Sequence, residues 1–297
     1  MRRGWCPTVH EPMPSGDGLL IRVKPFGGRL SSAMLRTLAD VAAGCGNGAI
    51  ELTVRGNIQL RGLSAATAVR AAQVLVAAGL ADPDPVREAR RNVIAVPPCD
   101  DALVAAVEAT LADTPGLPAK FHCMVTGSRV LESLSENSLS APGGGEGGVR
   151  WGVRDALLFG LPFGQTDAVT FRRLADLTDG HILRTTPWRA FYLAGTRDPA
   201  PFAAAGFITN PDDPRRTVTA CAGAPGCASA SVPARADAGT LAARGLRGIH
   251  LSGCAKLCGN PGAAATLIGA DGAYTLARHD YPAITGLTIG QAAELLA

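Results

Sequence analysis

The chain has 297 residues, enough for two ordinary domains or one large pseudo-symmetric one. Hydrophobic residues make up 47% and charged residues 18%, a composition typical of globular proteins that excludes a disordered chain. The net charge of +3 is too small to indicate a nucleic-acid-binding protein, and no run of about 18 apolar residues could span a membrane. The first residues lack the apolar stretch of a secretory signal, so we expect a cytoplasmic protein.

The first predicted elements occur twice along the chain. Residues 18–27 read GLLIRVKPFG and residues 156–164 read ALLFGLPFG, so each is an apolar strand candidate that closes on Pro-Phe-Gly. A helical pattern and then a pair of strand candidates follow in each copy. They are the helices over 33–43 and 168–177 and the strand pairs over 50–62 and 181–195. Strands of a few residues mixed with helices of this length predict an α+β unit that is internally duplicated.

A second kind of unit follows each copy. Residues 90–95 read RRNVIA and residues 215–220 read RRTVTA. A helix candidate and a strand candidate come next in both cases, over 101–113 and 121–125 and over 233–243 and 248–251. The sequence therefore predicts the divisions 1–80, 81–140, 141–149, 150–213 and 214–297, of which 81–140 is a shortened copy and 141–149 a glycine-rich linker.

Four cysteines stand close together in the last quarter of the chain. Cys221 and Cys227 are spaced C-x5-C, 26 residues follow, and Cys254 and Cys258 are spaced C-x3-C. A [4Fe–4S] cluster needs four thiolates held by tightly bent backbone, and glycine and proline surround all four of these residues. Structural zinc, disulfides and ordinary buried cysteines are the alternatives, but zinc sites favour shorter spacings in both halves. Cys6, Cys45, Cys99 and Cys123 are expected to be unligated.

No nucleotide cofactor is indicated by the glycine-rich segments. Residues 44–48 follow a helix rather than a strand, and residues 141–148 have neither a preceding strand nor a following Lys-Ser/Thr. We therefore expect electrons to come from an external donor, a ferredoxin or an NAD(P)H-dependent reductase. We also expect the protein to be a monomer.

Three segments resemble the superfamily of siroheme-type nitrite and sulfite reductases and their relatives. They are residues 6–8 with 13–20, residues 219–227 and residues 250–256. The resemblance covers nearly the whole chain and implies two ferredoxin-like half-domains and two α/β domains, of which only the second holds a [4Fe–4S] cluster on Cys221, Cys227, Cys254 and Cys258. The first two segments are most similar to those relatives that act, with O₂, in aerobic cobalamin biosynthesis. These enzymes hydroxylate precorrin-3A with O₂ and close a lactone to give precorrin-3B.

The resemblance also implies an anion-binding pocket. Relatives that reduce sulfite surround their anion with four basic residues, and Arg55, Arg91 and Lys120 match three of them. His122 stands in the fourth position, which weakens the sulfite-reducing interpretation. A precorrin carries many carboxylates, so we predict that it is bound by Arg55, Arg61, Arg91, Lys120 and Arg189. For Arg61, a solvated strand face is an equally good interpretation.

Two other functions stay open at this stage. One is a small siroheme-dependent nitrite or sulfite reductase, in which Cys258 would also bridge to the siroheme iron. The other is a non-catalytic [4Fe–4S] electron-transfer or tetrapyrrole-binding protein. The resemblance further implies a second, non-haem iron, for which His10, Glu11 and His250 are weak candidates. No catalytic residue can be assigned from the sequence.

Overall fold

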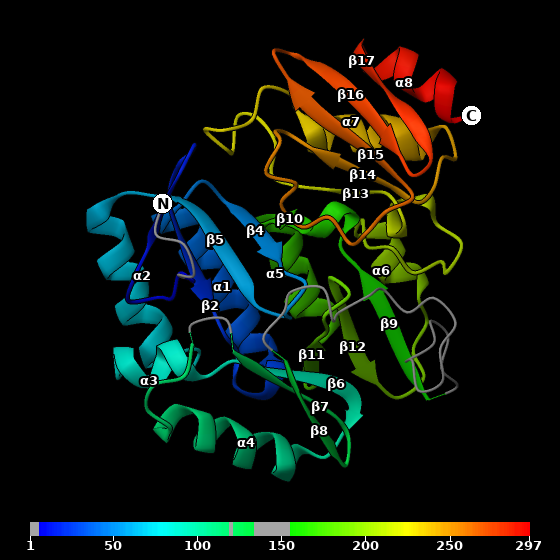
Figure 1. Ribbon diagram of the computed structural model, residues 1–297. Helices are drawn as coiled ribbons and strands as arrows, with labels where there is room; N and C mark the ends of the chain where they lie inside the picture. The colour runs from blue at the N-terminus through cyan, green and yellow to red at the C-terminus, as the bar shows by residue number, and fades with distance from the viewer. Residues whose placement is uncertain (1–5, 119–120, 134–154) are drawn as a thin grey trace. The chain divides into compact units, whose positions relative to one another are not determined.

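The computed structural model describes residues 6–118, 121–133 and 155–297. It forms two compact units (Figure 1). Unit 1 comprises Met1–Pro14 and Gly18–Thr209, and unit 2 comprises Ser15–Asp17 and Asn210–Ala297. The predicted linker, 141–149, lies outside the described residues, and the five-part division of the chain stays a prediction.

Unit 1 contains two sheets that exchange short strands. The first sheet has the order β1 (Met13–Ser15), β2 (Gly18–Val23), β5 (Ile58–Leu63), β4 (Ala49–Leu52) and β10 (Gln165–Asp167). The second has the order β3 (Arg29–Ser31), β11 (Ile182–Thr185), β12 (Ala190–Ala194) and β9 (Ala156–Gly160). All pairings in both sheets that join these strands across the two halves are antiparallel. Each half of the chain thus completes the sheet of the other.

Each exchanged strand leads directly into a helix. β3 ends at Ser31, whose side chain caps α1 (Ser32–Cys45) by accepting from the Met34 amide. β10 ends at Asp167, whose carboxylate caps α5 (Ala168–Leu177) by accepting from the Thr170 amide at 2.8 Å. The turn before each strand is the Pro-Phe-Gly motif, with left-handed backbone at Gly27 (φ 58°) and at Phe163 (φ 54°). The Pro-Phe-Gly motif therefore forms the same kind of turn before β3 and before β10.

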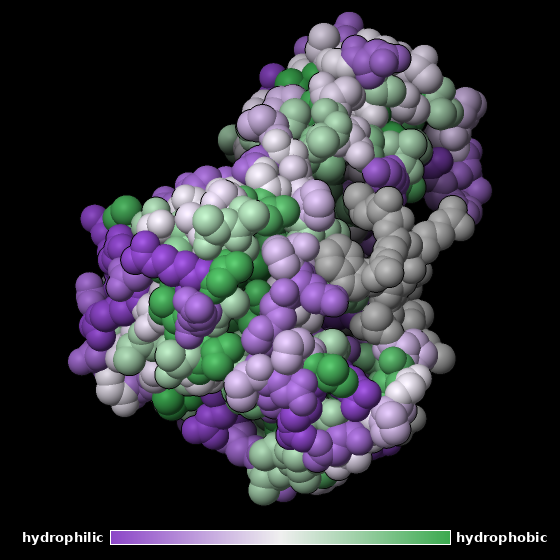
Figure 2. Space-filling model, turned by 90° about the vertical axis from the view of Figure 1, so that its left-hand side faces the viewer, coloured by the Kyte–Doolittle hydropathy of each residue, from purple (hydrophilic) through white to green (hydrophobic). Residues whose placement is uncertain are grey.

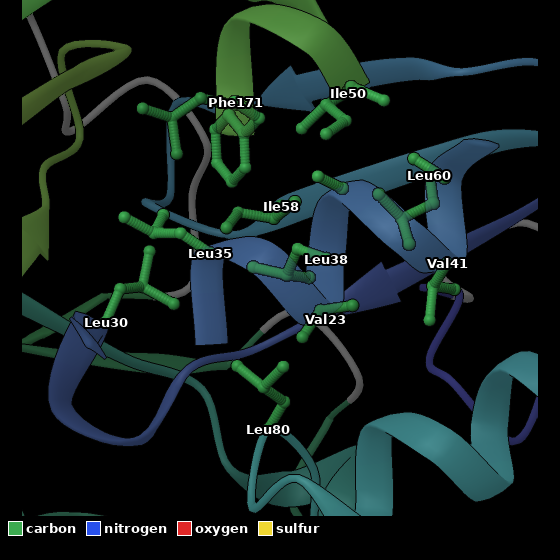
Figure 3. Packing of buried hydrophobic residues seen from close by; sticks show 14 of the residues in the cluster. Val23, Leu30, Leu35, Leu38, Val41, Ile50, Ile58, Leu60, Leu80 and Phe171 are labelled. Atoms are coloured by element: carbon green, nitrogen blue, oxygen red, sulfur yellow. The ribbon is translucent and has the colours of Figure 1, made fainter. Parts of the chain in front are cut away.

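Helices α1 and α5, with the helix over 65–77, cover one face of the first sheet. α1 packs against α5, α2 (Ala65–Ala77), β4 and β5, and α6 (Ala200–Ala204) packs against α5. Leu35 and Leu38 of α1 meet Ile58 and Leu60 of β5 and Phe171 of α5 in the core (Figure 3). Because successive strand residues point to opposite faces, the residues between these apolar ones must point away from the helices.

A smaller sheet completes unit 1. β6 (Val93–Cys99) and β7 (His122–Gly127) run parallel, and β8 (Arg129–Ser133) pairs antiparallel with β7. α4 (Asp101–Asp113) connects β6 to the strand parallel to it, and α3 (Pro85–Arg90) precedes β6 and packs against α4. Ile94 and Val96 of β6 pack with Leu158 and Ala190, so this sheet contacts the second sheet of the unit.

Unit 2 is built on one mixed sheet. Its order is β13 (Thr219–Ala220), β14 (Ile249–Ser252), β15 (Ala265–Ala270), β16 (Ala273–Arg278) and β17 (Tyr281–Leu287). The first three strands run parallel, and the last two pair antiparallel. α7 (Ala234–Ala243) packs on β13 and β14, and α8 (Ile289–Leu296) packs on β16 and β17. Because β13 and β14 run parallel, the loops that follow them begin at the same edge of the sheet.

The exposed side chains of the described residues are mixed in character. Hydrophilic and hydrophobic residues are interspersed over the face shown in Figure 2. No helix in the described ranges combines the length and the apolar character needed to cross a membrane.

The predicted helices over 168–177 and 101–113 are confirmed as α5 and α4, with the same bounds. The helices predicted over 33–43 and 233–243 are confirmed as α1 and α7 within two residues at each end. The sequence did not predict α2 and α3, nor the three-residue strands β3 and β10, which pair with residues more than a hundred positions away.

Candidate metal centre

The two cysteine-bearing loops follow neighbouring parallel strands. Cys221 comes directly after β13, and Cys254 comes two residues after β14. Ala220 pairs with Leu251 in the parallel register, and the Cys221 amide donates to the Leu251 carbonyl at 3.0 Å. Because the carboxyl ends of parallel strands meet at one edge of a sheet, the two loops begin side by side. The fold thus brings together cysteines more than thirty residues apart.

Backbone contacts hold the two loops together. The Gly253 amide donates to the Cys221 Sγ at 3.1 Å. The Ser231 amide donates to the Gly253 carbonyl at 3.0 Å. A Cβ at Gly253 would lie 2.6 Å from the Ala230 Cβ and 3.2 Å from the Gly223 Cα, so only glycine permits this approach. Amide-to-sulfur hydrogen bonds of this kind tune iron–sulfur clusters.

The thiols are electrostatic neighbours and are accessible. Cys221, Cys227 and Cys254 are half-buried, and Cys258 is exposed. Burial raises the pKa of the Cys258 thiol, and the neighbouring Cys221, Cys254 and Cys227 raise it further because like charges oppose ionisation. The other three cysteines of the predicted quartet therefore lie within electrostatic range of Cys258.

The side chain of Lys256 links the two cysteine loops. Its Nζ donates to the Ser229 Oγ at 2.8 Å, and Ser229 lies two residues after Cys227. The ammonium group also lowers the pKa of Cys258, although burial and the other thiols outweigh it. A cation between the second pair of cysteines favours a site with net negative charge, as four thiolates create.

The predicted quartet offers thiol donors only. In the described residues, no three His, Cys, Asp or Glu side chains lie close enough to hold one metal ion. A [4Fe–4S] cluster has a different requirement, since each thiolate binds its own iron and the ligands stand further apart. The donor set is all thiol, the loops are glycine-rich, and one sulfur already accepts an amide hydrogen bond. This donor chemistry suits the [4Fe–4S] cluster that the sequence predicts, and the cluster stays a prediction.

A buried tyrosine links α7 to the sheet of unit 2. Tyr274 on β16 is 3% exposed, and its hydroxyl donates to the Asp237 Oδ2 of α7 at 2.6 Å. Burial raises the pKa of Tyr274, and so do the hydrogen bond and the negative charge of Asp237. The tyrosine is therefore neutral and always available as a donor, which ties α7 to the sheet.

We expect Tyr274→Phe to lower the free energy of unfolding by about 1.5–3 kcal/mol, because it removes a hydrogen bond to a charged group. The measurement is urea unfolding followed by circular dichroism. Tyr281→Phe is the matched control, since Tyr281 is 65% exposed and its loss of a hydroxyl should change stability by less than about 0.5 kcal/mol. Equal midpoints for the two variants would contradict a fastening role for Tyr274.

Two of the predicted anion-binding residues lie in turns, not on strands. Arg55 is in the turn between β4 and β5, and Arg189 is in the turn between β11 and β12. A Cβ at Gly56, next to Arg55, would lie 3.1 Å from the Thr185 Oγ1, so the first turn lies against the start of the second. Both arginines lie between the strands of the predicted pairs 50–62 and 181–195, because each pair closes in a hairpin at this point.

A row of polar side chains lies on the sheet face opposite the helices. Gln59 Nε2 donates to Glu51 Oε2 at 2.8 Å, and Arg22 Nη2 donates to Gln59 Oε1 at 2.7 Å. Arg61 Nη1 lies 3.6 Å from Glu51 Oε2. Glu51 and Arg61 are only 6% and 5% exposed. Arg22, Gln59, Glu51 and Arg61 therefore form a series of polar contacts, and Arg61 is not on a solvated face.

Arg91 is held by the protein's own carboxylates. It caps α3 rather than lying on a strand, and it is 2% exposed. Its guanidinium donates to Glu88 Oε2 at 2.7 Å and to Glu108 Oε1 at 2.5 Å, and it stacks on the Phe26 ring at 3.7 Å. Glu108 Oε2 also accepts from the Gly27 amide at 3.0 Å. Arg91 thus fixes the first Pro-Phe-Gly turn, and this geometry favours a structural role over the predicted substrate contact.

Lys24 shares this buried network. Its Nζ donates to the Glu88 carbonyl at 2.8 Å and to the Ala89 carbonyl at 3.1 Å. Burial lowers the pKa of Lys24 to about 8, Glu88 opposes that shift, and Arg91 adds to it. Lys120 itself lies outside the described residues, and His122 on β7 is fully buried.

The two histidines among the weak candidates for a second iron have other partners within their own units. His10 Nε2 lies 2.8 Å from the Asp82 carbonyl, and His250 Nδ1 lies 2.8 Å from the Thr219 hydroxyl within the sheet of unit 2. No group that includes either histidine and two further His, Cys, Asp or Glu ligands occurs in the part of the chain that the structure describes. These residues do not fit a facial triad, and we assign them no iron.

Sequence reasoning missed several residues that support the site. Lys256 stands between two cysteines and is one of only three lysines, so its position was a usable signal. Glu88 lies three residues before Arg91, a spacing that pairs charges on a helix, but nothing in the sequence marks Glu108 as the second partner. Tyr274 and Asp237 also carry no local pattern.

Comparisons with known proteins agree with the observed fold. The family model described as the nitrite/sulfite reductase ferredoxin-like half domain matches residues 11–78. The solved structure of the Mycobacterium tuberculosis NirA protein superposes with a TM-score of 0.67 at 15% identity, covering 93% of this chain and 79% of that one. This likeness concerns the fold. The mixed α+β architecture with a ferredoxin-like half domain is confirmed.

A curated relative is similar over most of both chains. It is a precorrin-3B synthase of Sinorhizobium sp., 30% identical, and the match covers 93% of this chain and 83% of the relative.

Proposed function

Because the chain belongs to the precorrin-3B synthase family of the nitrite and sulfite reductase superfamily, we propose that it is an iron–sulfur oxidoreductase of aerobic cobalamin biosynthesis. The observation that carries this proposal is that the loops of Cys221 and Cys254 begin side by side at one edge of a sheet, where the Gly253 amide donates to the Cys221 sulfur. These four residues would hold a [4Fe–4S] cluster. When bound, such a cluster transfers electrons one at a time, which is what reaction of O₂ with a closed-shell substrate requires.

The proposal includes a duplicated architecture in which only the second copy binds a cluster. The exchanged strands β3 and β10, each entered through a Pro-Phe-Gly turn and followed by a capped helix, support a common origin of the two halves. β6, α4 and β7 of unit 1 repeat the strand–helix–strand order of β13, α7 and β14. The first copy has only Cys99 and Cys123 in this region, so it lacks the ligands.

The reaction that we propose is hydroxylation of precorrin-3A by O₂ with closure of a lactone by a ring acetate, to give precorrin-3B. One oxygen atom enters the product and the other leaves as water, so two electrons and two protons must be supplied. No nucleotide-binding motif is present, so a ferredoxin or an NAD(P)H-dependent reductase would supply them. A second, non-haem iron would belong to this chemistry, but the described residues offer no ligand set for it, and no step is derived from it.

Basic residues of unit 1 would orient the substrate. A precorrin presents acetate and propionate groups, and arginine binds carboxylates with paired hydrogen bonds. Arg55 and Arg189 in adjoining turns, Arg61 on the polar sheet face and Lys120 make up the proposed set. Arg91 is the weakest member, since two buried glutamates already neutralise it.

We expect Lys120→Ala to weaken precorrin-3A binding by roughly tenfold to 150-fold, the effect of losing one charged hydrogen bond of about 1.5–3 kcal/mol. The cluster absorption should be unchanged, because the cysteines lie in unit 2. Binding is measured by titration under anaerobic conditions, with Arg70→Ala, an exposed cation on α2, as the control. Normal binding by the Lys120 variant would remove this residue from the pocket.

The experiment that tests the function is turnover of precorrin-3A by anaerobically purified protein, given O₂ and a reductant. Formation of the hydroxylated lactone would support the proposal. A haem-type absorption band after co-expression with siroheme synthesis would instead identify a siroheme-dependent nitrite or sulfite reductase. A cluster-loaded protein that binds precorrin-3A but leaves it unchanged would be a non-catalytic carrier.

A further inference from the structure

A turn near the start of the chain lies on the first cysteine loop. Ser15–Asp17 belongs to unit 2 although the rest of that unit begins at Asn210. The Ser15 hydroxyl donates to the Gly226 carbonyl at 2.9 Å, across 211 positions of sequence. Gly226 directly precedes Cys227, so this hydrogen bond reaches the peptide that carries a predicted ligand.

Gly16 makes the closest approach of this turn. A Cβ built on Gly16 would lie 2.6 Å from the Ala228 amide nitrogen, 2.8 Å from the Cys227 carbonyl carbon and 2.9 Å from the Pro225 carbonyl oxygen. All three are backbone atoms, so no side chain can rotate away to make room. Gly16 is also not among the glycines with positive φ, unlike Gly18 at 120°. The glycine is required here for close contact and not for backbone conformation.

The turn at Ser15 and Gly16 contacts the backbone on both sides of Cys227. Ser15 holds the residue before it, and Gly16 packs on its own carbonyl and on the amide after it. The loop's own contribution at this point is a hydrogen bond from the Ala230 amide to the Cys227 carbonyl at 3.0 Å. A cysteine in a loop needs such fixation if its sulfur is to meet an iron without a large ordering cost.

We propose that Ser15 and Gly16 are positioning residues of the metal centre, which hold the Cys221–Cys227 loop in the conformation that presents Cys227. The inference rests on the proposed cluster and adds an N-terminal part to its binding site. Neither residue ligates iron. Their role is to slow the release of the cluster by keeping one of its four ligands in place.

Linkage gives this role a second consequence. If the turn stabilises the loaded loop more than the empty one, the cluster must stabilise the turn by the same factor. We therefore expect the backbone amides of residues 15–18 to exchange hydrogen more slowly in the cluster-loaded protein than in the apoprotein. A purely structural contact would leave that exchange rate the same in both forms.

The test compares three single variants of the full chain, purified anaerobically with their cluster. They are Gly16→Ala, Ser15→Ala and the control Gly290→Ala, which lies in α8 of the same unit with its nearest neighbour, the Thr288 Oγ1, 3.9 Å from the added Cβ. The cluster is exposed to a ferrous-iron chelator, and loss of its visible absorption is followed with time. Thermal unfolding of each apoprotein is recorded in parallel.

We expect Gly16→Ala to speed cluster loss by about tenfold or more, and Ser15→Ala by about twofold to tenfold, the effect of one neutral hydrogen bond. Gly290→Ala should lose its cluster at the wild-type rate. The Gly16→Ala apoprotein should melt at a lower temperature than the wild type because its Cβ meets backbone atoms, whereas the Ser15→Ala and Gly290→Ala apoproteins should melt close to the wild-type temperature. If Gly16→Ala does not fold, Ser15→Ala decides the question.

Cluster loss at the wild-type rate in Ser15→Ala, or in a folded Gly16→Ala, would overturn the positioning role and leave the cluster itself in place. A wild-type protein that contains no cluster would overturn the proposed function instead. The two failures are therefore distinguishable.

Discussion

Replacing Cys254 with serine is expected to abolish the cluster and all turnover of precorrin-3A. Cys254 lies in the second cysteine loop, two residues after β14 and next to Gly253, whose amide donates to the Cys221 sulfur. A thiolate is the ligand that iron–sulfur clusters require, and a serine hydroxyl stays protonated and binds iron weakly at neutral pH. The anaerobically purified variant should lack the broad visible absorption and contain little iron or acid-labile sulfide.

Cys99→Ser is the matched control for this variant. Cys99 ends β6 in unit 1, is half-buried, and has no part in the quartet. Its loss should leave the iron and sulfide content unchanged. Wild-type iron and sulfide in the Cys254 variant would mean that Cys254 is not a ligand and that the cluster is held by other residues.

Replacing Arg91 with methionine is expected to destabilise unit 1 by about 3–5 kcal/mol, because it leaves two buried carboxylates without their cation. Glu88 is fully buried and Glu108 is 7% exposed, and both accept from the Arg91 guanidinium. Thermal and urea unfolding without substrate measure this effect. A second change, Glu108→Gln, should restore part of the stability, since it removes one of the uncompensated charges.

The Arg91 variant also separates two roles for this residue. Arg70→Met, which removes an exposed cation from α2, should change stability by less than about 0.5 kcal/mol. If Arg91→Met is as stable as this control and fails to bind precorrin-3A, Arg91 faces the substrate and the structural role is wrong.

The parts of the fold that the sequence predicts well are those with a local signal. α4 and α5 match their predicted bounds because apolar residues recur at helical spacing behind the capping residues Asp100 and Asp167. β3 and β10 escaped prediction because three residues carry no periodicity and their partners lie in the other half of the chain. Pairing across such a distance is a property of the whole fold.

The candidate site follows the same division. The cysteine spacing predicts the quartet, since thiol ligands can be recognised from the residue type alone. Contacts between residues far apart in the sequence leave no such local signal. Arg91 matches an anion-binding motif, yet Glu108, seventeen residues later on another helix, decides what its guanidinium contacts. The contact of Gly16 with the Cys227 loop is invisible in the sequence for the same reason.

The most direct test of the account is the metal content of the wild-type protein purified under strict exclusion of oxygen. Iron, acid-labile sulfide and zinc are determined per chain, together with the visible absorption spectrum. We predict about four iron and four sulfide per chain, as a [4Fe–4S] cluster requires, with broad absorption that bleaches on reduction. Protein that contains one zinc and no sulfide, or no metal at all after cluster reconstitution, would contradict it.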